Sequence, residues 1–186
     1  MSLDSLQDLY IEHIQDLYSA EQQIIEALPK MIDKATNAQL KNGFNLHLQQ
    51  TREHARRLEG IGRRAGQDID GKTCKGMQGV IKEGAEVLKE DGDPNVIDAA
   101  LISAAQRVEH YEMAGYGCAR AYAEALGLED DAETLQQTLD EEGETDKKLT
   151  QLAESLINPR ASGTESRSSS TRSRSTGRNA EDESRM

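Results

Sequence analysis

Four long stretches of the chain repeat apolar residues at intervals of three and four positions, the spacing of one face of an α-helix. They cover residues 3–34, 38–64, 93–126 and 130–157. Asp93 followed by Pro94 favours a helix start, Gly127 favours a helix end, and Asn158 followed by Pro159 favours the end of the last helix. The chain has no Trp, one Phe and three Pro, a composition that favours long helices over strands. The sequence therefore predicts an all-α protein.

The connections between these stretches predict how the helices are arranged. Only a few residues join the first stretch to the second, or the third to the fourth, so each pair should form an antiparallel hairpin. About thirty residues, 65–93, separate the two hairpins and contain a short helix near 77–90. One long crossover between two helical hairpins is typical of a ferritin-like four-helix bundle. We expect one such domain over residues 1–158.

Residues 159–186 are rich in Ser and Arg and nearly free of apolar side chains. Such a segment cannot bury enough surface to offset the entropy of ordering, so we expect a disordered tail. The tail holds six Arg against four acidic residues, whereas the whole chain has a net charge of -12. The acidic bundle should repel nucleic acid, so nucleic-acid contact is expected only through the tail, if at all. We favour a solubilising extension.

The sequence predicts a cytoplasmic protein. No apolar run is long enough for a membrane span, and the N-terminus lacks the pattern of a signal peptide. The two cysteines do not form a disulfide framework, which fits a reducing compartment. We expect Cys118 to be a buried thiol, and Cys74 to be a more reactive thiol in a loop beside Lys72 and Lys75.

Polar residues interrupt all four apolar faces near the middle of each helix, where a bundle is driest. They are Glu21 in the first stretch, His47 and His54 in the second, Glu109 and Glu112 in the third, and Glu142 and Asp146 in the fourth. Converging carboxylates repel one another unless they bind protons or a cation. We therefore predict that these residues are ligands of a site for two metal ions per chain. Many oxygens with one or two imidazoles suit iron or manganese.

A plainer interpretation applies to each of these residues taken singly. Glu109, Glu142 and Asp146 could lie at a helix edge, solvated or paired with Arg, and a lone His on an apolar face is more often a satisfied core residue. Gly115, one turn from Glu112, is best explained by close helix packing. The agreement among four helices favours the metal site.

Several segments resemble the YciE/YciF family of bacterial ferritin-like proteins. They are DLYSAEQQIIEALPKM, HLQQTREHARRLEGI, CKGMQGVIKEGAEVL, ALISAAQRVEHYEMAGYGCARAYAEALGL and LDEEGETDKKLTQLAE. The resemblance covers residues 3–157. It implies a ferritin-like bundle, a homodimer and a link to bacterial stress responses. It also implies metal ligands at Glu21, His47, Glu109, Glu112, Glu142 and Asp146.

The chain departs from the family at Gln50, where the H-x-x-E-T pattern usually has Glu. Either Glu53 or His54 replaces that ligand, or the site is weakened, for example to one metal ion. The leading hypothesis is a metal-binding stress protein whose open coordination positions bind oxygen or peroxide, with ferroxidase- or peroxidase-like turnover. The alternative is a non-enzymatic dimeric stress protein with a degenerate metal site, acting through its surface or tail.

Overall fold

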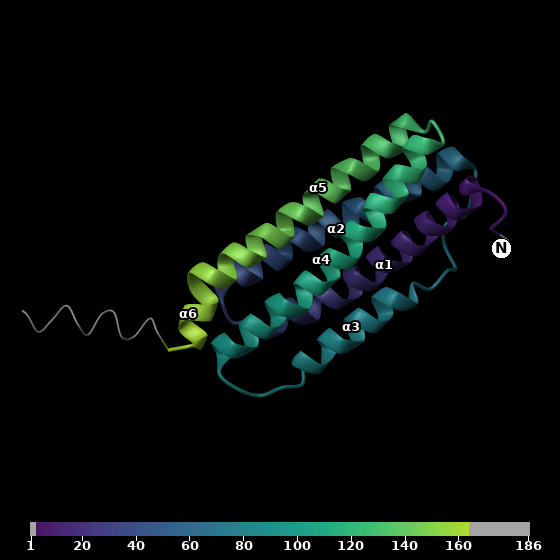
Figure 1. The fold of residues 1–186 in the computed structure, drawn as a ribbon. Coiled ribbons are helices and arrows are strands. Elements are labelled where there is room, and N and C mark those ends of the chain that lie inside the picture. Colours follow the sequence, from purple (N-terminus) through teal and green to yellow (C-terminus); the bar gives the residue numbers. More distant parts are fainter. Residues whose placement is uncertain (1–2, 164–186) are drawn as a thin grey trace, which may run out of the picture.

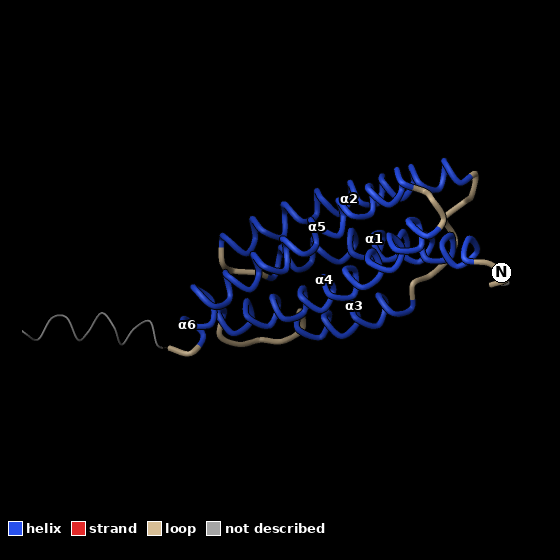
Figure 2. Tube along the Cα trace, turned by 45° about the horizontal axis from the view of Figure 1, so that its top comes forward, coloured by secondary structure: helices blue, strands red, loops and turns tan. Residues whose placement is uncertain are grey.

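The computed structural model describes residues 3–163, and this part of the chain is helical without strands (Figure 2). Four long helices run side by side as a bundle (Figure 1). They are α1 (Leu6–Lys34), α2 (Ala38–Ala65), α4 (Pro94–Ala125) and α5 (Glu129–Leu152). The shorter α3 (Lys75–Val87) lies in the crossover between α2 and α4. The prediction of a four-helix bundle with a short extra helix in its crossover is confirmed.

Residues next to the helices mark where several of them begin and where α4 stops. The Ser5 hydroxyl accepts a hydrogen bond from the first turn of α1, and the side chain of Asn37 does the same for α2. Asp93 caps α4, with Pro94 at its first turn, as the sequence predicts. Gly127 adopts a φ of 70° just after α4, where a side chain would be strained. These local signals place α4 correctly from sequence alone.

The helices pack as two hairpins. Helix α1 contacts α2 and α4, and α5 contacts α2 and α4, so the four form a closed bundle. Helix α3 lies outside it, against α1 and α4 (Figure 1). A Cβ added at Gly115 of α4 would come within 2.8 Å of the Leu17 side chain of α1. This close approach supports helix packing as the reason for that glycine.

The end of the last helix differs from the prediction. Helix α5 continues through a π-helical turn, Ala153–Ile157, into α6 (Asn158–Ala161), which packs against α4. The predicted end at Asn158-Pro159 is wrong, because Pro159 stands in the first turn of α6, where a helix tolerates proline. The rest of the expected tail, residues 164–186, lies outside the described residues. No helix among the described residues is long and apolar enough to span a membrane.

Two apolar clusters fill the two ends of the bundle. One cluster contains Phe44 and Leu101, and the other contains Tyr10, Leu58 and Leu135. On α4 and α5 the predicted ligand positions fall between the residues of these two clusters, and on α1 and α2 they lie at or close to the boundary between them. The bundle therefore has a polar layer near mid-length with an apolar cluster on either side of it.

Both cysteine expectations are wrong. Cys74 is fully buried at the start of α3, where its thiol lies 2.9 Å from an Asp16 carboxylate oxygen and 3.1 Å from the Tyr111 hydroxyl. Its N–H also donates to the Ser19 hydroxyl of α1, so the crossover folds back onto the bundle and covers the thiol. Burial and the neighbouring Asp16 raise the pKa of the Cys74 thiol. Cys118 is exposed on α4.

Candidate metal centre

Six of the seven predicted ligands meet in the polar layer. Each has at most 3% of its surface exposed. Glu21 comes from α1, His47 and His54 from α2, Glu109 and Glu112 from α4, and Glu142 from α5. The spacings of seven residues in α2 and three in α4 place each pair on one helix face. The expectation that acidic groups from separate helices converge in a dry interior is confirmed.

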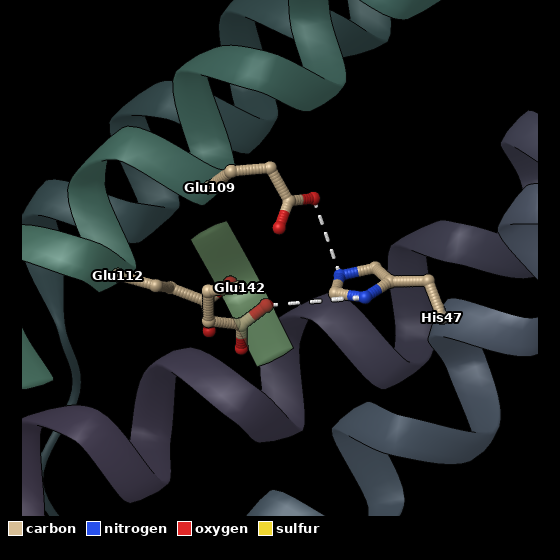
Figure 3. Close-up of side chains that lie close together, drawn as sticks. All are labelled: His47, Glu109, Glu112 and Glu142. Carbon is tan, nitrogen blue, oxygen red and sulfur yellow. Dashed lines mark ion pairs between the residues drawn. The ribbon is translucent and has the colours of Figure 1, made fainter. Parts of the chain in front are cut away.

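These side chains form two groups with a common member. One ligand atom from each of His47, Glu109, Glu112 and Glu142 can be chosen so that all lie within 4.8 Å of one another (Figure 3). The same holds for Glu21, His54 and Glu142. Glu142 thus stands where a carboxylate can serve two ions at once.

The imidazole rings point into this cluster of carboxylates. His47 Nε2 lies 3.2 Å from Glu109 Oε1, and His47 Nδ1 lies 3.9 Å from Glu142 Oε2 (Figure 3). His54 Nδ1 lies 2.9 Å from Glu142 Oε1 and 3.6 Å from Glu21 Oε1. Each ring therefore offers a nitrogen to one of the two groups.

Many atoms of the cluster have no hydrogen-bond partner within the described protein. Both carboxylate oxygens of Glu112 and of Glu142 are in this state, as is one oxygen each of Glu21 and Glu109. The ring atoms His47 Nε2 and His54 Nδ1, although close to oxygens, also make no hydrogen bond of acceptable geometry. A buried polar atom without a partner costs about 1–3 kcal/mol, so a cluster of them is expensive to keep as a purely structural feature.

The protonation of the cluster follows from its burial. Desolvation, reinforced by the neighbouring carboxylates, raises the pKa of Glu109 and Glu112 well above the usual range. Desolvation lowers the pKa of His47, which leaves a neutral ring suited to metal coordination. Burial opposes the charge on His54, but the carboxylates of Glu142 and Glu21 outweigh it and raise its pKa to about 10. Without metal, protons therefore compensate the buried negative charge.

A second layer of contacts orients His54 and Glu21. His54 Nε2 lies 2.8 Å from Glu141 Oε2. The Arg57 guanidinium donates hydrogen bonds to both oxygens of Glu141, at 2.9 and 3.0 Å. Burial opposes the charge on Glu141, but Arg57 and His54 lower its pKa to about 2, so it holds the ring as a carboxylate. The buried Tyr116 hydroxyl donates to Glu21. A carboxylate behind a ligating histidine fixes the ring and its tautomer, a common arrangement at metal sites.

Sequence analysis missed Glu141 and Arg57. The available signals were the carboxylate adjacent to Glu142 and the arginine three residues after His54, one helix turn away. Neither signal is specific, because an exposed Glu–Arg pair produces the same pattern.

Asp146 is the predicted ligand that the structure does not bring into either group. Its carboxylate accepts a hydrogen bond of 2.9 Å from Gln106 and lies 3.3 Å from the exposed His110 ring, with 20% of the side chain exposed. Gln50 lines a surface pocket between α2 and α5. Glu53 is half-exposed and pairs with Arg56 at 2.8 Å. Of the two replacements considered for the missing family Glu, His54 is the one inside the cluster.

Comparison with known proteins identifies the family. Residues 5–162 match the model of a domain of unknown function, DUF892. Protein YciF of Escherichia coli is 39% identical over 162 residues, which cover 87% of this chain and 98% of that protein.

Solved structures agree with this match. The crystal structure of the E. coli stress protein YciF has a TM-score of 0.80 at 39% identity, covering 83% of this chain and 98% of that one. YcfI from Rhodopseudomonas palustris, provisionally classed as a structural protein, has a TM-score of 0.77 at 42% identity, covering 80% of this chain and 95% of that one. A protein from Xanthomonas campestris shares only the fold, with a TM-score of 0.69 at 15% identity, 87% of this chain and 99% of that one being covered. The chain therefore belongs to the DUF892 family and is a relative of the E. coli stress protein YciF.

Proposed function

We propose that the cluster holds two iron or manganese ions and that the protein uses them to consume oxygen or peroxide during bacterial stress. His47, Glu109 and Glu112 would hold one ion, Glu21 and His54 the other, and Glu142 both. The observation that carries this proposal is the set of buried carboxylate oxygens that no protein group satisfies. Four carboxylates with two imidazoles suit iron or manganese better than zinc or calcium.

The protein's own groups have defined roles in this proposal. The bound ions would supply open coordination positions for oxygen or peroxide, and redox chemistry in the case of iron. Burial raises the pKa of Glu109 and Glu112, and the neighbouring carboxylates raise that of His54, so all three would release a proton on becoming ligands. Glu141, held by Arg57, keeps the His54 ring aimed at the cluster. The apolar clusters on either side keep bulk water away from these groups.

The cellular setting is part of the same proposal. The E. coli relative is described as a stress protein, and we extend that role to this chain. We further propose that the protein acts in the cytoplasm as a homodimer, as the family resemblance implies. Analytical ultracentrifugation of the purified full chain tests the dimer directly, since a monomer of 20.5 kDa is readily told from its dimer.

Metal content is the test of the proposed site. The full chain is purified without chelator, or reloaded anaerobically with ferrous or manganous ion, and analysed by elemental mass spectrometry. We expect about two ions per chain, as in related carboxylate bundles. Glu142→Gln should lose most of this metal, because it removes the ligand common to both groups. Asp146→Asn, one turn further along α5, is the matched control and should keep it.

Two results would contradict the proposal. One is a wild-type chain that binds no iron or manganese under these conditions. The other is equal metal content in the Glu142→Gln and wild-type proteins, which would place any bound metal elsewhere. In the first case the non-enzymatic alternative would stand, with the protein acting through its surface.

A further inference from the structure

An apolar pocket opens between α1, α3 and α4 and leads to the cluster. Its volume is about 70 Å³. Exposed Lys30 and half-buried Leu88 lie among its outer residues, and the buried His47 and Glu109 lie among its inner ones. The pocket therefore connects the surface beside α3 to two predicted ligands. Helix α3 forms one wall, which gives the long crossover a role at the site (Figure 1).

Small side chains make this space. Alanine or glycine from all three helices lines it, namely Ala27 of α1, Gly84 and Ala85 of α3, and Ala104 and Ala105 of α4. Aliphatic side chains such as Ile24, Val80 and Val108 supply most of the remaining wall. A Cβ added at Gly84 would lie 3.3 Å from the Ala104 Cβ, so α3 is held close to α4 beside the pocket.

The chemistry of the wall selects what can occupy it. A volume of about 70 Å³ exceeds the 10–15 Å³ that one water needs, but it is well below the 150 Å³ of an engineered cavity that binds benzene. Between Lys30 at the outer end and His47 and Glu109 at the inner end, the side chains of the wall are apolar, so peroxide or another polar molecule would lose its hydration there without compensation. At the inner end, His47 is 3% exposed and its Nε2 has no hydrogen-bond partner among the described residues. The occupant should thus be a very small apolar molecule that can reach a ligand-bearing site.

We infer that this pocket binds dioxygen and admits it to the metal centre, and that peroxide does not use it. The inference rests on the proposed function, because the pocket ends at His47 and Glu109. It goes further by choosing between the two oxidants and by assigning the entry route to α3. No other feature of the cluster makes this choice.

Dioxygen binding is tested first on the metal-free full chain. Dissolved dioxygen is paramagnetic and speeds the relaxation of nearby methyl protons, so NMR spectra are compared under oxygen and under nitrogen. We expect several-fold larger enhancement at Ile24, Val80 and Val108 than at Leu58 and Leu135 in the apolar cluster at the other end. Equal enhancement in both regions would overturn the inference. The result does not depend on metal binding, so it separates this inference from the proposed function.

Blocking the pocket provides the second test. Ala85→Phe and Ala27→Phe each place a large ring in the pocket from a half-buried position, and Ala100→Phe is a control in α4 at a half-buried alanine outside it. A variant is used only if its circular dichroism spectrum and melting temperature match those of the wild type. Two blocking variants are made so that the test survives if one of them fails to fold. We expect the local relaxation enhancement to disappear in the blocked variants and to persist in the control.

The metal-loaded protein then discriminates the two oxidants. After loading with ferrous ion, the blocked variants should keep their iron and consume dioxygen several-fold more slowly, with peroxide consumption unchanged. Unchanged dioxygen consumption with a blocked pocket would overturn the entry route. Equal slowing for both oxidants would overturn the selectivity. If neither iron nor manganese binds, the proposed function fails, and the metal-free relaxation experiment alone decides whether dioxygen occupies the pocket.

Discussion

Glu112 offers a direct test of whether the polar layer is built for a ligand or for stability. Its side chain is 1% exposed, and neither carboxylate oxygen has a hydrogen-bond partner. Methionine has a similar length and shape without the two oxygens. In Glu112→Met the metal-free protein should therefore become more stable, whereas most core substitutions destabilise a protein.

The size of the effect follows from the two orphaned oxygens. Each unsatisfied buried polar atom costs about 1–3 kcal/mol, and a carboxyl group lost as a unit should release about 2–4 kcal/mol. In a chain of this length, a gain of that size raises the melting temperature by roughly 5–15 °C.

The sign of the pH dependence is also defined. The pKa of Glu112 is raised well above its unfolded value, so between the two values the folded state binds more protons than the unfolded state. Glu112 therefore makes the metal-free protein less stable as pH rises through this window. The stabilisation by Glu112→Met should accordingly be larger at pH 7 than near pH 4.5.

The assay is thermal unfolding of chelator-treated protein by calorimetry, at pH 4.5 and pH 7. Glu133→Met, at an exposed position of α5, is the control and should change stability by less than about 0.5 kcal/mol. Adding manganous ion should stabilise the wild type more than Glu112→Met, because the substitution removes a ligand from one of the two groups. A metal-free Glu112→Met protein that is less stable than the wild type would refute the reasoning, because the carboxyl group would then be a satisfied structural element.

Three further predictions concern the cluster, the hairpin turn and the thiols. Metal loading at pH 7 should release roughly three protons per chain, from the carboxyls of Glu109 and Glu112 and from the His54 imidazolium, and metal affinity should fall as the pH falls. Calorimetry in buffers of different ionisation enthalpy measures both, and no proton release would contradict the pKa directions. Asp98→Ala should lower the free energy of unfolding, measured in urea, by about 3 kcal/mol. The buried carboxylate accepts hydrogen bonds from Thr36 N, Thr36 Oγ1 and Asn37 N at 2.7–2.9 Å, so a loss below about 1 kcal/mol would contradict this. A thiol reagent should label exposed Cys118 in the native protein and buried Cys74 only after unfolding, as mass spectrometry would show.

The helices were predictable because their signals are local. Apolar spacing shows the buried face of each helix, and Asp93 with Pro94 marks a start whatever the rest of the chain does. The π-helical turn before Asn158 has no such signal, since it depends on how α5 and α6 pack against α4. Pro159 therefore suggested an end where the helix in fact continues.

The ligands were only partly predictable, because the spacing of residues along a helix shows which face they share but not how deeply each side chain is buried. Asp146 follows Glu142 by four residues, which turns it about 40° further round the helix, to a part-exposed edge near Gln106. The role of Glu141 depends on Arg57 and His54 arriving from α2, a tertiary contact that α5 alone does not encode. Cys74 illustrates the same limit, because its burial depends on how the crossover folds onto α1.

The cluster poses two physical problems, and protons solve only one of them. Protonation of Glu109 and Glu112, and the imidazolium of His54 beside Glu142, compensate the buried charge. Protonated Glu109 and Glu112 can each donate to a facing carboxylate, but each O–H joins only two oxygens, so two protons still leave some of the orphaned oxygens without a partner. A cation at the centre neutralises the charge and coordinates the orphaned oxygens at the same time. That double requirement is why the geometry favours a metal over a proton-balanced structural core.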